Sequence, residues 1–215
     1  MSSLAVRRTV CVVETVRGPG QRAGLSRAAV LSAAGELFTQ GGSDAVTMRA
    51  LARRLQVAPN ALYSHVPSKT ALLDDLLDEL LDRVELPAPD VADPAPGLHA
   101  ILCSTYDVLT AHPDLVPLYL ARQGARGPHA VRLGEITDAL LARAGVEPAA
   151  VALARRVLIV HVIGSAAFAT GTPVASGSPQ AERPIPAQQS RDSFGLSLRW
   201  LLAGIVRGTD GLAQT

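Results

Sequence analysis

The order of apolar and polar residues along the chain predicts helices. In several consecutive stretches, apolar residues recur about three or four positions apart, the spacing that places them on one side of an α-helix. Alternating runs of β-branched residues, which would indicate strands, are scarce. Alanine and leucine, both strong helix formers, are abundant. We therefore expect an all-α fold.

The N-terminal part of this pattern predicts three helices in close succession. The first spans residues 26–40 and ends at a pair of glycines. Thr47 is a suitable N-cap for a second, short helix, and Pro59 stands where the first turn of a third helix tolerates proline. Only residues 56–58 separate these two short helices. This is helix-turn-helix geometry, in which the second short helix presents its outward side chains to a major groove.

The rest of the chain is also predicted to be helical. Residues 69–85 form an amphipathic pattern with a leucine side and an acidic side, and such an acidic side is usually solvated rather than catalytic. Four prolines mark residues 86–96 as a linker, and residues 171–189, rich in Gly, Pro and Ser, are expected to form a flexible loop. The remaining predicted helices are 97–111, 113–123, 128–144, 148–170 and 190–207.

The charged residues are distributed unevenly. Residues 1–70 contain nine basic and three acidic residues, a balance of +6, whereas residues 71–215 contain eleven and sixteen, a balance of −5. The net charge of the whole chain, +1, therefore conceals a basic N-terminal module joined to an acidic remainder. A basic module is the electrostatic feature that nucleic-acid binding requires.

The run TMRALARRLQVAPNALYSHVPSKTALLDDLL, from Thr47 onward, resembles the DNA-binding domain of TetR-type transcriptional repressors. The resemblance includes the recognition-helix pattern Leu62-Tyr63-x-His65-Val66 and a lysine that opens the following helix. It is specific because several features coincide over about forty-five residues. The family usually has glycine in the turn where this chain has Gln56, so we expect some backbone strain there.

The resemblance implies an organisation for the whole chain. It predicts a helix-turn-helix DNA-binding domain over residues 25–70 and a helical regulatory and dimerisation domain over residues 71–215. Residues 1–24 are expected to be a flexible arm that either tracks DNA or remains a solvated tail. The family's dimer implies that the helices near 148–170 and 190–207 meet their symmetry mates in a four-helix bundle. The alternative is that these two very apolar helices are simply internal core.

The implied partners are double-stranded operator DNA, a second copy of the chain and a small-molecule effector that releases the repressor from its operator. For base contact we select Arg49, which can bind guanine, and Asn60, which can pair with adenine. The other DNA-binding candidates hold phosphates or line the reading surface: Thr47, Pro59, Ala61, Tyr63, His65 and Lys69. Arg53 and Arg54 are either phosphate contacts or ordinary surface charge. For His65 and Tyr63 the alternative is a packing role.

The candidate effector contacts are the aromatic or polar-tipped residues of the C-terminal helices, because helix bundles hold small molecules between their helices. They are Tyr106, His112, Tyr119, His161, Phe168 and Trp200, with His99, Cys103 and His129 as further candidates. A lone histidine on an apolar helix, such as His161, is more often a satisfied core residue than a ligand contact.

Other classes of protein find little support. No nucleophile–base spacing, glycine-rich phosphate loop or cluster of metal ligands indicates an enzyme, a metal site or a cofactor. A ligand-binding or interaction protein of repressor-like fold that no longer binds DNA is a second alternative, which the retention of Arg49, Tyr63 and Lys69 disfavours. No uninterrupted apolar run reaches membrane-spanning length, and two cysteines make no disulfide framework, so we expect a reduced, cytoplasmic protein.

Overall fold

The computed structural model describes residues 25–87, 93–171 and 186–212. The described residues contain helices and no strand, which confirms the all-α fold. Their elements are α1 (Arg27–Ala45), α2 (Met48–Leu55), α3 (Pro59–Leu62), α4 (Lys69–Leu81), α5 (Pro94–Thr110), a 3-10 turn η1 (Pro113–Leu115), α6 (Val116–Arg122), α7 (Pro128–Arg143), α8 (Pro148–Ala169) and α9 (Ala187–Leu212). The predicted arm over 1–24 and most of the predicted loop over 171–189 lie outside the described residues.

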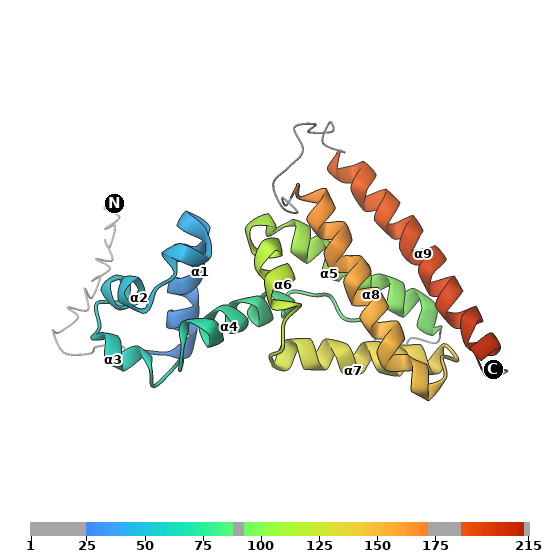
Figure 1. Cartoon of the computed structure of the whole chain (residues 1–215), viewed down its shortest axis with the longest axis horizontal. Coiled ribbons are helices and arrows are strands. Elements are labelled where there is room, and N and C mark those ends of the chain that lie inside the picture. The colour runs from blue at the N-terminus through green and yellow to red at the C-terminus, as the bar shows by residue number, and fades with distance from the viewer. Residues whose placement is uncertain (1–24, 88–92, 172–185, 213–215) are drawn as a thin grey trace, which may run out of the picture.

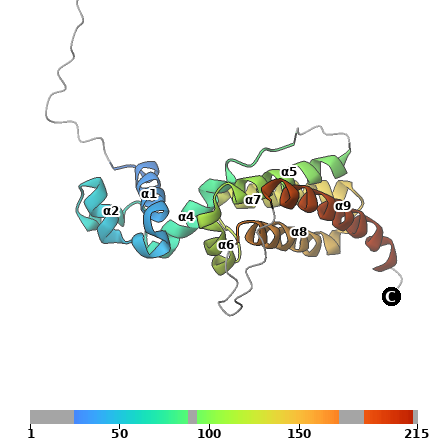
Figure 2. The ribbon, with the colours of Figure 1, turned by 90° about the horizontal axis from the view of Figure 1, so that it is seen from above.

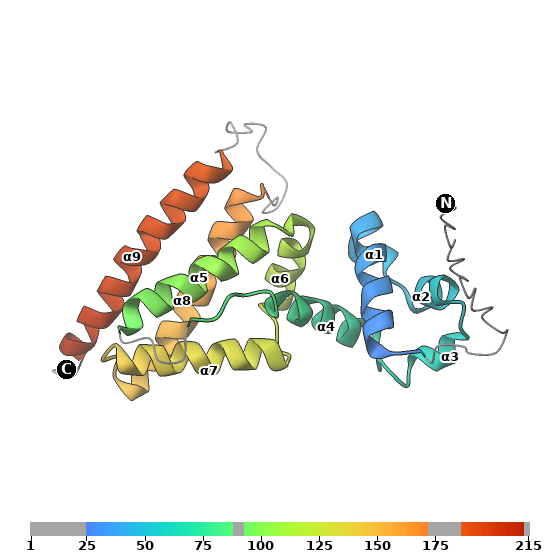
Figure 3. The ribbon, with the colours of Figure 1, turned by 180° about the vertical axis from the view of Figure 1, so that it is seen from behind.

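Two groups of helices are joined by α4. Helices α1 to α3 form a small head at one end, and α5 to α9 form the larger body at the other (Figure 1). From behind, α4 runs from the head into the body, where it ends near α6 and α7 (Figure 3). Helix α4 packs on α1 in the head and on α7 in the body, so it links the two groups mechanically.

The head is built as its local sequence predicts. The Ser26 side chain accepts a hydrogen bond from the Ala29 amide and caps α1, and Thr47 caps α2 by accepting from the Ala50 amide at 3.1 Å. The glycine pair breaks the helical geometry of α1, because Gly42 has φ of 64°. Fully buried apolar side chains from each helix form the core of the head: Val30, Ala34, Leu51, Leu62 and Val66.

The turn between α2 and α3 contains the left-handed residue that the sequence predicts. Gln56 has φ of 55° and ψ of 40°, and its amide donates to the carbonyls that end α2. A left-handed residue with a side chain costs about 1–2 kcal/mol relative to the right-handed region. The chain therefore tolerates strain at the point that sets the angle between α2 and α3.

Several predicted helix boundaries are wrong, including those of α9, which spans Ala187–Leu212 rather than 190–207. Helix α4 ends at Leu81 rather than near residue 85, because residues 82–84 form tight turns. Helix α5 begins at Pro94, inside the predicted linker, with Asp93 as its N-cap. Proline lacks the amide hydrogen that the first turn of a helix leaves unbonded, so it begins helices as well as ending them. Pro128 and Pro148 begin α7 and α8 in the same way.

The body has an aromatic centre between α5, α8 and α9. Tyr106 and Phe194 stack with ring centroids 4.2 Å apart, and His161 also stacks on Phe194, with ring centroids 5.3 Å apart. The His161 Nε2 lies 2.9 Å from the Ser197 hydroxyl, which itself donates to the Phe194 carbonyl, so the imidazole is the donor. Burial lowers the pKa of His161, which keeps the ring neutral inside this cluster.

Within one copy of the chain, helix α8 is buried on one side only. One side packs against α5, α7 and α9, whereas Leu153, Val160 and Phe168 on the other side are 63, 64 and 85% exposed. Trp200 of α9 is 68% exposed, and α9 lies beside α8 (Figure 2). By length and composition alone α8 could also cross a membrane, a test that core helices of other proteins pass as well.

Replacing Gln56 with glycine should stabilise the head. Glycine adopts positive φ without steric cost, although it also gains entropy in the unfolded chain, so the expected net gain is about 0.5–1 kcal/mol. Urea unfolding at fixed protein concentration measures this difference. The control is Arg53→Gly inside α2, which should destabilise by about 1 kcal/mol because its φ is helical. A destabilised Gln56→Gly protein would contradict the strain at this turn.

Candidate functional site

The predicted DNA-binding residues gather on the outer surface of the head. Thr47 and Arg49 are exposed at the start of α2, and the first three residues of α3, Pro59 to Ala61, are exposed as well. Tyr63, directly after α3, is 51% exposed, whereas His65 and Lys69 are half-buried. Small, polar and aromatic side chains thus project from α3 and the turn after it, and Leu62 is the buried residue of α3.

The structure separates the two arginines that the sequence leaves equivalent. Arg54 forms an ion pair with Glu36 of α1, so its charge is engaged in holding α2 against α1. Arg53 also lies in the last turn of α2, and its side chain is exposed. Arg53 therefore remains available for a partner, and Arg54 has a structural role.

Helix α4 is tied to both parts of the molecule by neighbouring carboxylates. Asp75 pairs with Arg27 of the head at 2.6 Å. Asp74 binds Arg122 of α6 through two hydrogen bonds of 2.7 and 2.5 Å. The Tyr119 hydroxyl, also on α6, donates to the Leu77 carbonyl at 2.6 Å, and burial raises the pKa of this phenol, so it stays protonated.

Asp78 is the most buried of these α4 carboxylates. Its side chain is only 4% exposed, and its two carboxylate oxygens accept from the amides of His129 and Ala130 at 3.1 and 2.9 Å. These amides belong to the first turn of α7, where no residue of the same helix can bind them. A residue from α4 therefore supplies the N-cap of α7.

Gly127 makes room for this cap. A Cβ on Gly127 would lie 2.2 Å from the Asp78 carboxyl carbon, which no side chain could accommodate. The imidazole of His129 also lies 3.2 Å from the Asp82 carboxylate. The acidic side of α4, expected to be solvated, is thus partly engaged in contacts with α6 and α7.

A partly open cavity of about 170 Å³ lies beside these contacts, between α4, α5, α7 and α8. Its walls are largely apolar, with Ile101, Leu102, Leu133 and Val162 among them. The polar side chains that reach it are Thr105, Tyr119, Gln123, Thr137 and Arg155. An apolar cavity with a few polar groups is the usual form of a small-molecule site.

Only Tyr119 of the six predicted effector contacts lines this cavity. Tyr106 and His161 belong to the aromatic centre around Phe194, and Phe168 and Trp200 are exposed on the outer side of α8 and α9. The predicted residues do not gather in one place, because aromatic and polar-tipped residues fill several different positions in a helical body. Residues of small or aliphatic type, which carry no distinctive signal, form most of the cavity.

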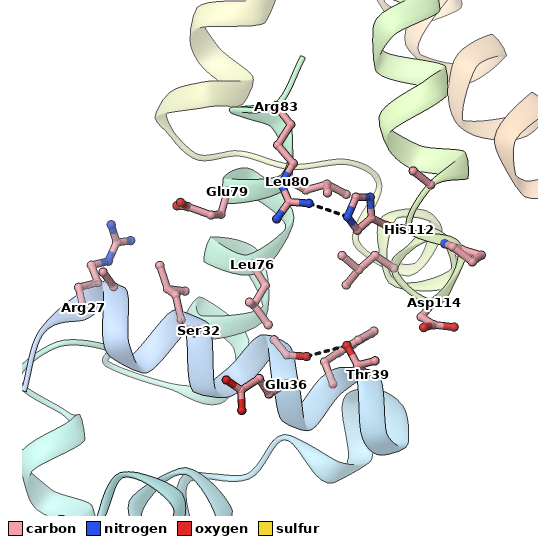
Figure 4. Close-up of a pocket in the computed structure, with 17 residues that line it drawn as sticks. Arg27, Ser32, Glu36, Thr39, Leu76, Glu79, Leu80, Arg83, His112 and Asp114 are labelled. Atoms are coloured by element: carbon pink, nitrogen blue, oxygen red, sulfur yellow. Dashed lines mark hydrogen bonds between the residues drawn. The ribbon is translucent and has the colours of Figure 1, made fainter. Parts of the chain in front are cut away.

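His112 lies in a different place, an open crevice of about 820 Å³ between the head and the body. In Figure 4 the side chain of Arg83 meets His112 on one side of this crevice, while Leu76 and Leu80 of α4 point into it. The guanidinium donates to the His112 Nε2 at 2.7 Å, and the Nδ1 lies 2.9 Å from the Val108 carbonyl. His112 is therefore a neutral ring with its hydrogen on Nδ1.

The other candidate residues make local contacts. The Cys103 sulfur lies 3.7 Å from the His99 Nδ1, and burial raises the pKa of this thiol. The His99 Nε2 lies 3.3 Å from the Gly195 carbonyl of α9. Within the ranges that the structure describes, no three His, Cys, Asp or Glu side chains are placed to hold a metal ion.

Comparison with known proteins agrees with this arrangement. Residues 30–76 match the family model described as bacterial regulatory proteins, tetR family. The chain is 30% identical to the SCO7704 protein from Streptomyces coelicor, whose structure superposes with a TM-score of 0.60 over 85% of this chain and 95% of that one. The TetR family protein ActR of Streptomyces coelicolor, in complex with actinorhodin, is 26% identical, with a TM-score of 0.71 over 87 and 99% of the two chains.

The chain belongs to the TetR family.

A curated relative, an HTH-type transcriptional regulator of Saccharopolyspora erythraea, is 36% identical over 141 residues. The match covers 66% of this chain and 59% of that relative, so this TetR-family chain spans little more than half of the relative's length. The family model ends at residue 76, two residues before Asp78. The contacts between Asp78 and α7 thus lie beyond the part of the chain that the family model describes.

Sequence reasoning missed the role of Asp78 in this TetR-family protein. One signal was present, since Gly127 precedes Pro128 at the start of α7 and glycine has no side chain with which to cap a helix. A helix that begins in this way needs a cap from elsewhere. The sequence has six acidic residues between 74 and 85, all of them along one predicted helix. The pattern therefore could not show which of them supplies the cap.

Replacing Asp78 with alanine should destabilise the protein by about 1–3 kcal/mol, because two amides at the start of α7 would lose a buried charged acceptor. Chemical unfolding at fixed protein concentration measures the loss. The matched control is Glu79→Ala, which removes a carboxylate from the next, exposed position and should change stability by less than about 0.5 kcal/mol. Equal effects of the two substitutions would contradict the capping role of Asp78.

Proposed function

We propose that this TetR-family protein is a DNA-binding transcriptional repressor that a small molecule releases from its operator. The observation that carries the proposal is the reading surface of the head. Side chains able to bind bases and phosphates are exposed on α2 and α3, with Lys69 half-buried at the start of α4, while the apolar residues of the same helices form the core of the head. In helix-turn-helix proteins such a surface lies on the major groove.

The proposed contacts divide into two kinds. Arg49 can donate two hydrogen bonds to the O6 and N7 atoms of guanine, and Asn60 can form a paired contact with adenine. Tyr63, His65 and Lys69 hold phosphates, with the Thr47 hydroxyl as a further contact. We assign residues 25–70 to DNA binding and residues 71–215 to regulation. Helix α4 contacts both parts and links them.

The functional unit proposed is a homodimer formed through α8 and α9. Support comes from the exposed apolar side chains of both helices, because a row of large apolar residues at helical spacing favours burial against a partner. Gly164 lies in this row, and among the described residues no atom outside its own stretch of α8 comes within 4 Å of the position of a Cβ there. A second copy could therefore approach closely. Two-fold symmetry suits a pseudo-palindromic operator.

The proposed effector site is the partly open cavity of the body. Among similar structures, ActR is in complex with actinorhodin, so a protein of this fold holds a small molecule. Leu81 of α4 lines the cavity of this chain, and α4 also carries Asp75, the partner of Arg27 in the head. A ligand that favours one position of α4 would alter the spacing of the two heads. By linkage, operator DNA then weakens ligand binding by the same factor.

The proposed location is the cytoplasm, where bacterial operator DNA is found. Helix α8 would be an interface helix rather than a membrane span. Support comes from its contacts with α5, α7 and α9 and from Arg155, which pairs with Asp138 on its inner side.

Alanine substitutions of Arg49 and Lys69 should weaken DNA binding in different ways. Arg49→Ala should cost about 1–3 kcal/mol on the preferred operator and relax base preference at one symmetric pair of positions. Lys69→Ala should weaken binding to all sequences alike and reduce the slope of log K against log salt by about two for a dimer. Titrations on the upstream intergenic DNA and on scrambled duplexes measure both effects.

The control for these titrations is Arg132→Ala, which removes an exposed arginine from α7, far along the chain from the reading surface. It should leave the affinity, the base preference and the salt slope unchanged. Failure of the wild-type protein to bind any upstream DNA would instead favour a ligand-binding protein that has lost DNA recognition. A uniform loss of affinity in Arg49→Ala would show that this residue holds a phosphate.

Replacing Gly164 with arginine should disrupt the proposed dimer, because it places bulk and an unpaired charge in a desolvated contact. Sedimentation at micromolar concentration should show the wild type as a dimer and the variant as monomer or aggregate. Ala142→Arg, which adds the same side chain at an exposed position of α7, should remain dimeric. A monomeric wild type would overturn the α8–α9 interface.

A further inference from the structure

The cavity has an uneven distribution of hydrogen-bond donors. The hydroxyls of Thr105, Thr137 and Tyr119 donate to backbone carbonyls at 2.7, 2.7 and 2.6 Å. Their hydrogens are therefore occupied, and each oxygen can only accept from a ligand. The remaining side chains with N–H groups at the cavity are Gln123, which is exposed, and Arg155.

Arg155 is held in a position that leaves much of its guanidinium available. Its Nε donates to Asp138 at 2.8 Å, and that contact fixes the plane of the group. Among the described residues, no other protein acceptor is bonded to its two terminal amino groups, which carry four N–H donors. The side chain is about one-third exposed, so it marks an edge of the cavity rather than its centre.

Gly134 of α7 provides the space for this arginine. A Cβ at Gly134 would lie 3.2 Å from the Nη1 of Arg155, so a larger residue would press on the guanidinium. Gly134 and Arg155 both line the cavity. Because Gly134 has no side chain, the terminal amino groups of Arg155 can lie beside the largely apolar cavity.

The cavity volume limits what can occupy it. At about 170 Å³ it is similar in size to an engineered apolar cavity of about 150 Å³ that binds benzene. One six-membered ring fits such a space without rearrangement. Its walls, which include Ile101, Leu133 and Val162, provide apolar contact for the ring.

We propose that the effector is a monocyclic organic acid, with its ring in the cavity and its carboxylate bound by the terminal amino groups of Arg155. This inference rests on the proposed function, since it names the ligand class of the proposed effector site. A carboxylate matches the fork of a guanidinium through two parallel hydrogen bonds. Because Arg155 lies at the edge of the cavity, the carboxylate keeps part of its hydration while the ring is desolvated.

Calorimetric titration of the full-length protein with benzoate and benzamide, measured at pH 7, tests the proposal. The two probes have nearly the same shape, but only benzoate is an anion. Wild-type protein should bind benzoate at least about tenfold more tightly than benzamide, the factor expected for a charge-assisted hydrogen bond. Arg155→Gln should remove this preference by weakening benzoate while leaving benzamide within about a factor of two.

Three further variants keep the test decisive. Arg132→Gln removes an exposed arginine from α7 and should change neither affinity, which controls for net charge. Arg155→Lys retains the charge but not the fork and should give an intermediate preference. If Arg155→Gln does not fold, Gly134→Ala provides the same comparison, because its methyl group presses on Nη1 and should weaken benzoate selectively.

The outcomes separate this inference from the proposed function. Equal binding of the two probes by the wild type, no binding of benzoate, or equal weakening of both probes by Arg155→Gln would overturn the acid class. Band shifts with operator DNA, in the absence and presence of benzoate, test repression on their own. A protein that binds and releases its operator with other molecules but does not discriminate benzoate would retain the proposed function and lose this inference.

Discussion

The buried carboxylate of Asp78 is the contact on which the arrangement of head and body depends. It satisfies two amides at the start of α7, in a place where water has little access and where no residue of α7 itself can do so. An ionised group this deeply buried persists only when it has hydrogen-bond partners. The same contact fixes the position of α4 against the body, because the carboxylate lies where a side chain on Gly127 would begin.

Helix α4 gains its importance from making such contacts with both parts of the molecule. Arg27 of the head binds Asp75, and Arg122 of the body binds the adjacent Asp74. Two neighbouring carboxylates on one helix thus hold different parts of the molecule. A displacement of the body relative to α4 would reach the head through a short, largely helical path, which is the physical basis that an effector in the body requires in order to influence DNA binding.

Helix α8 has two sides with different roles in the proposals. Its inner side contributes Arg155 and Val162 to the cavity, and its outer side carries Leu153 and Val160, which are exposed in one copy of the chain. A ligand in the cavity and a partner on the outer side would therefore contact the same rigid element. Coupling between ligand and dimer geometry would follow from this shared helix, without a separate pathway.

The sequence by itself determined the parts of this protein that depend on neighbours along the chain. Caps at Ser26 and Thr47, the left-handed Gln56 and the helical period of apolar residues are local properties, so the helices of the head could be predicted, although the ends of α4 and α5 could not. Only the tertiary structure decided which side chains meet across long separations. Asp78 and the α7 amides are 51 and 52 residues apart, and the walls of the cavity come from at least four helices, so no periodic pattern in one segment could reveal them.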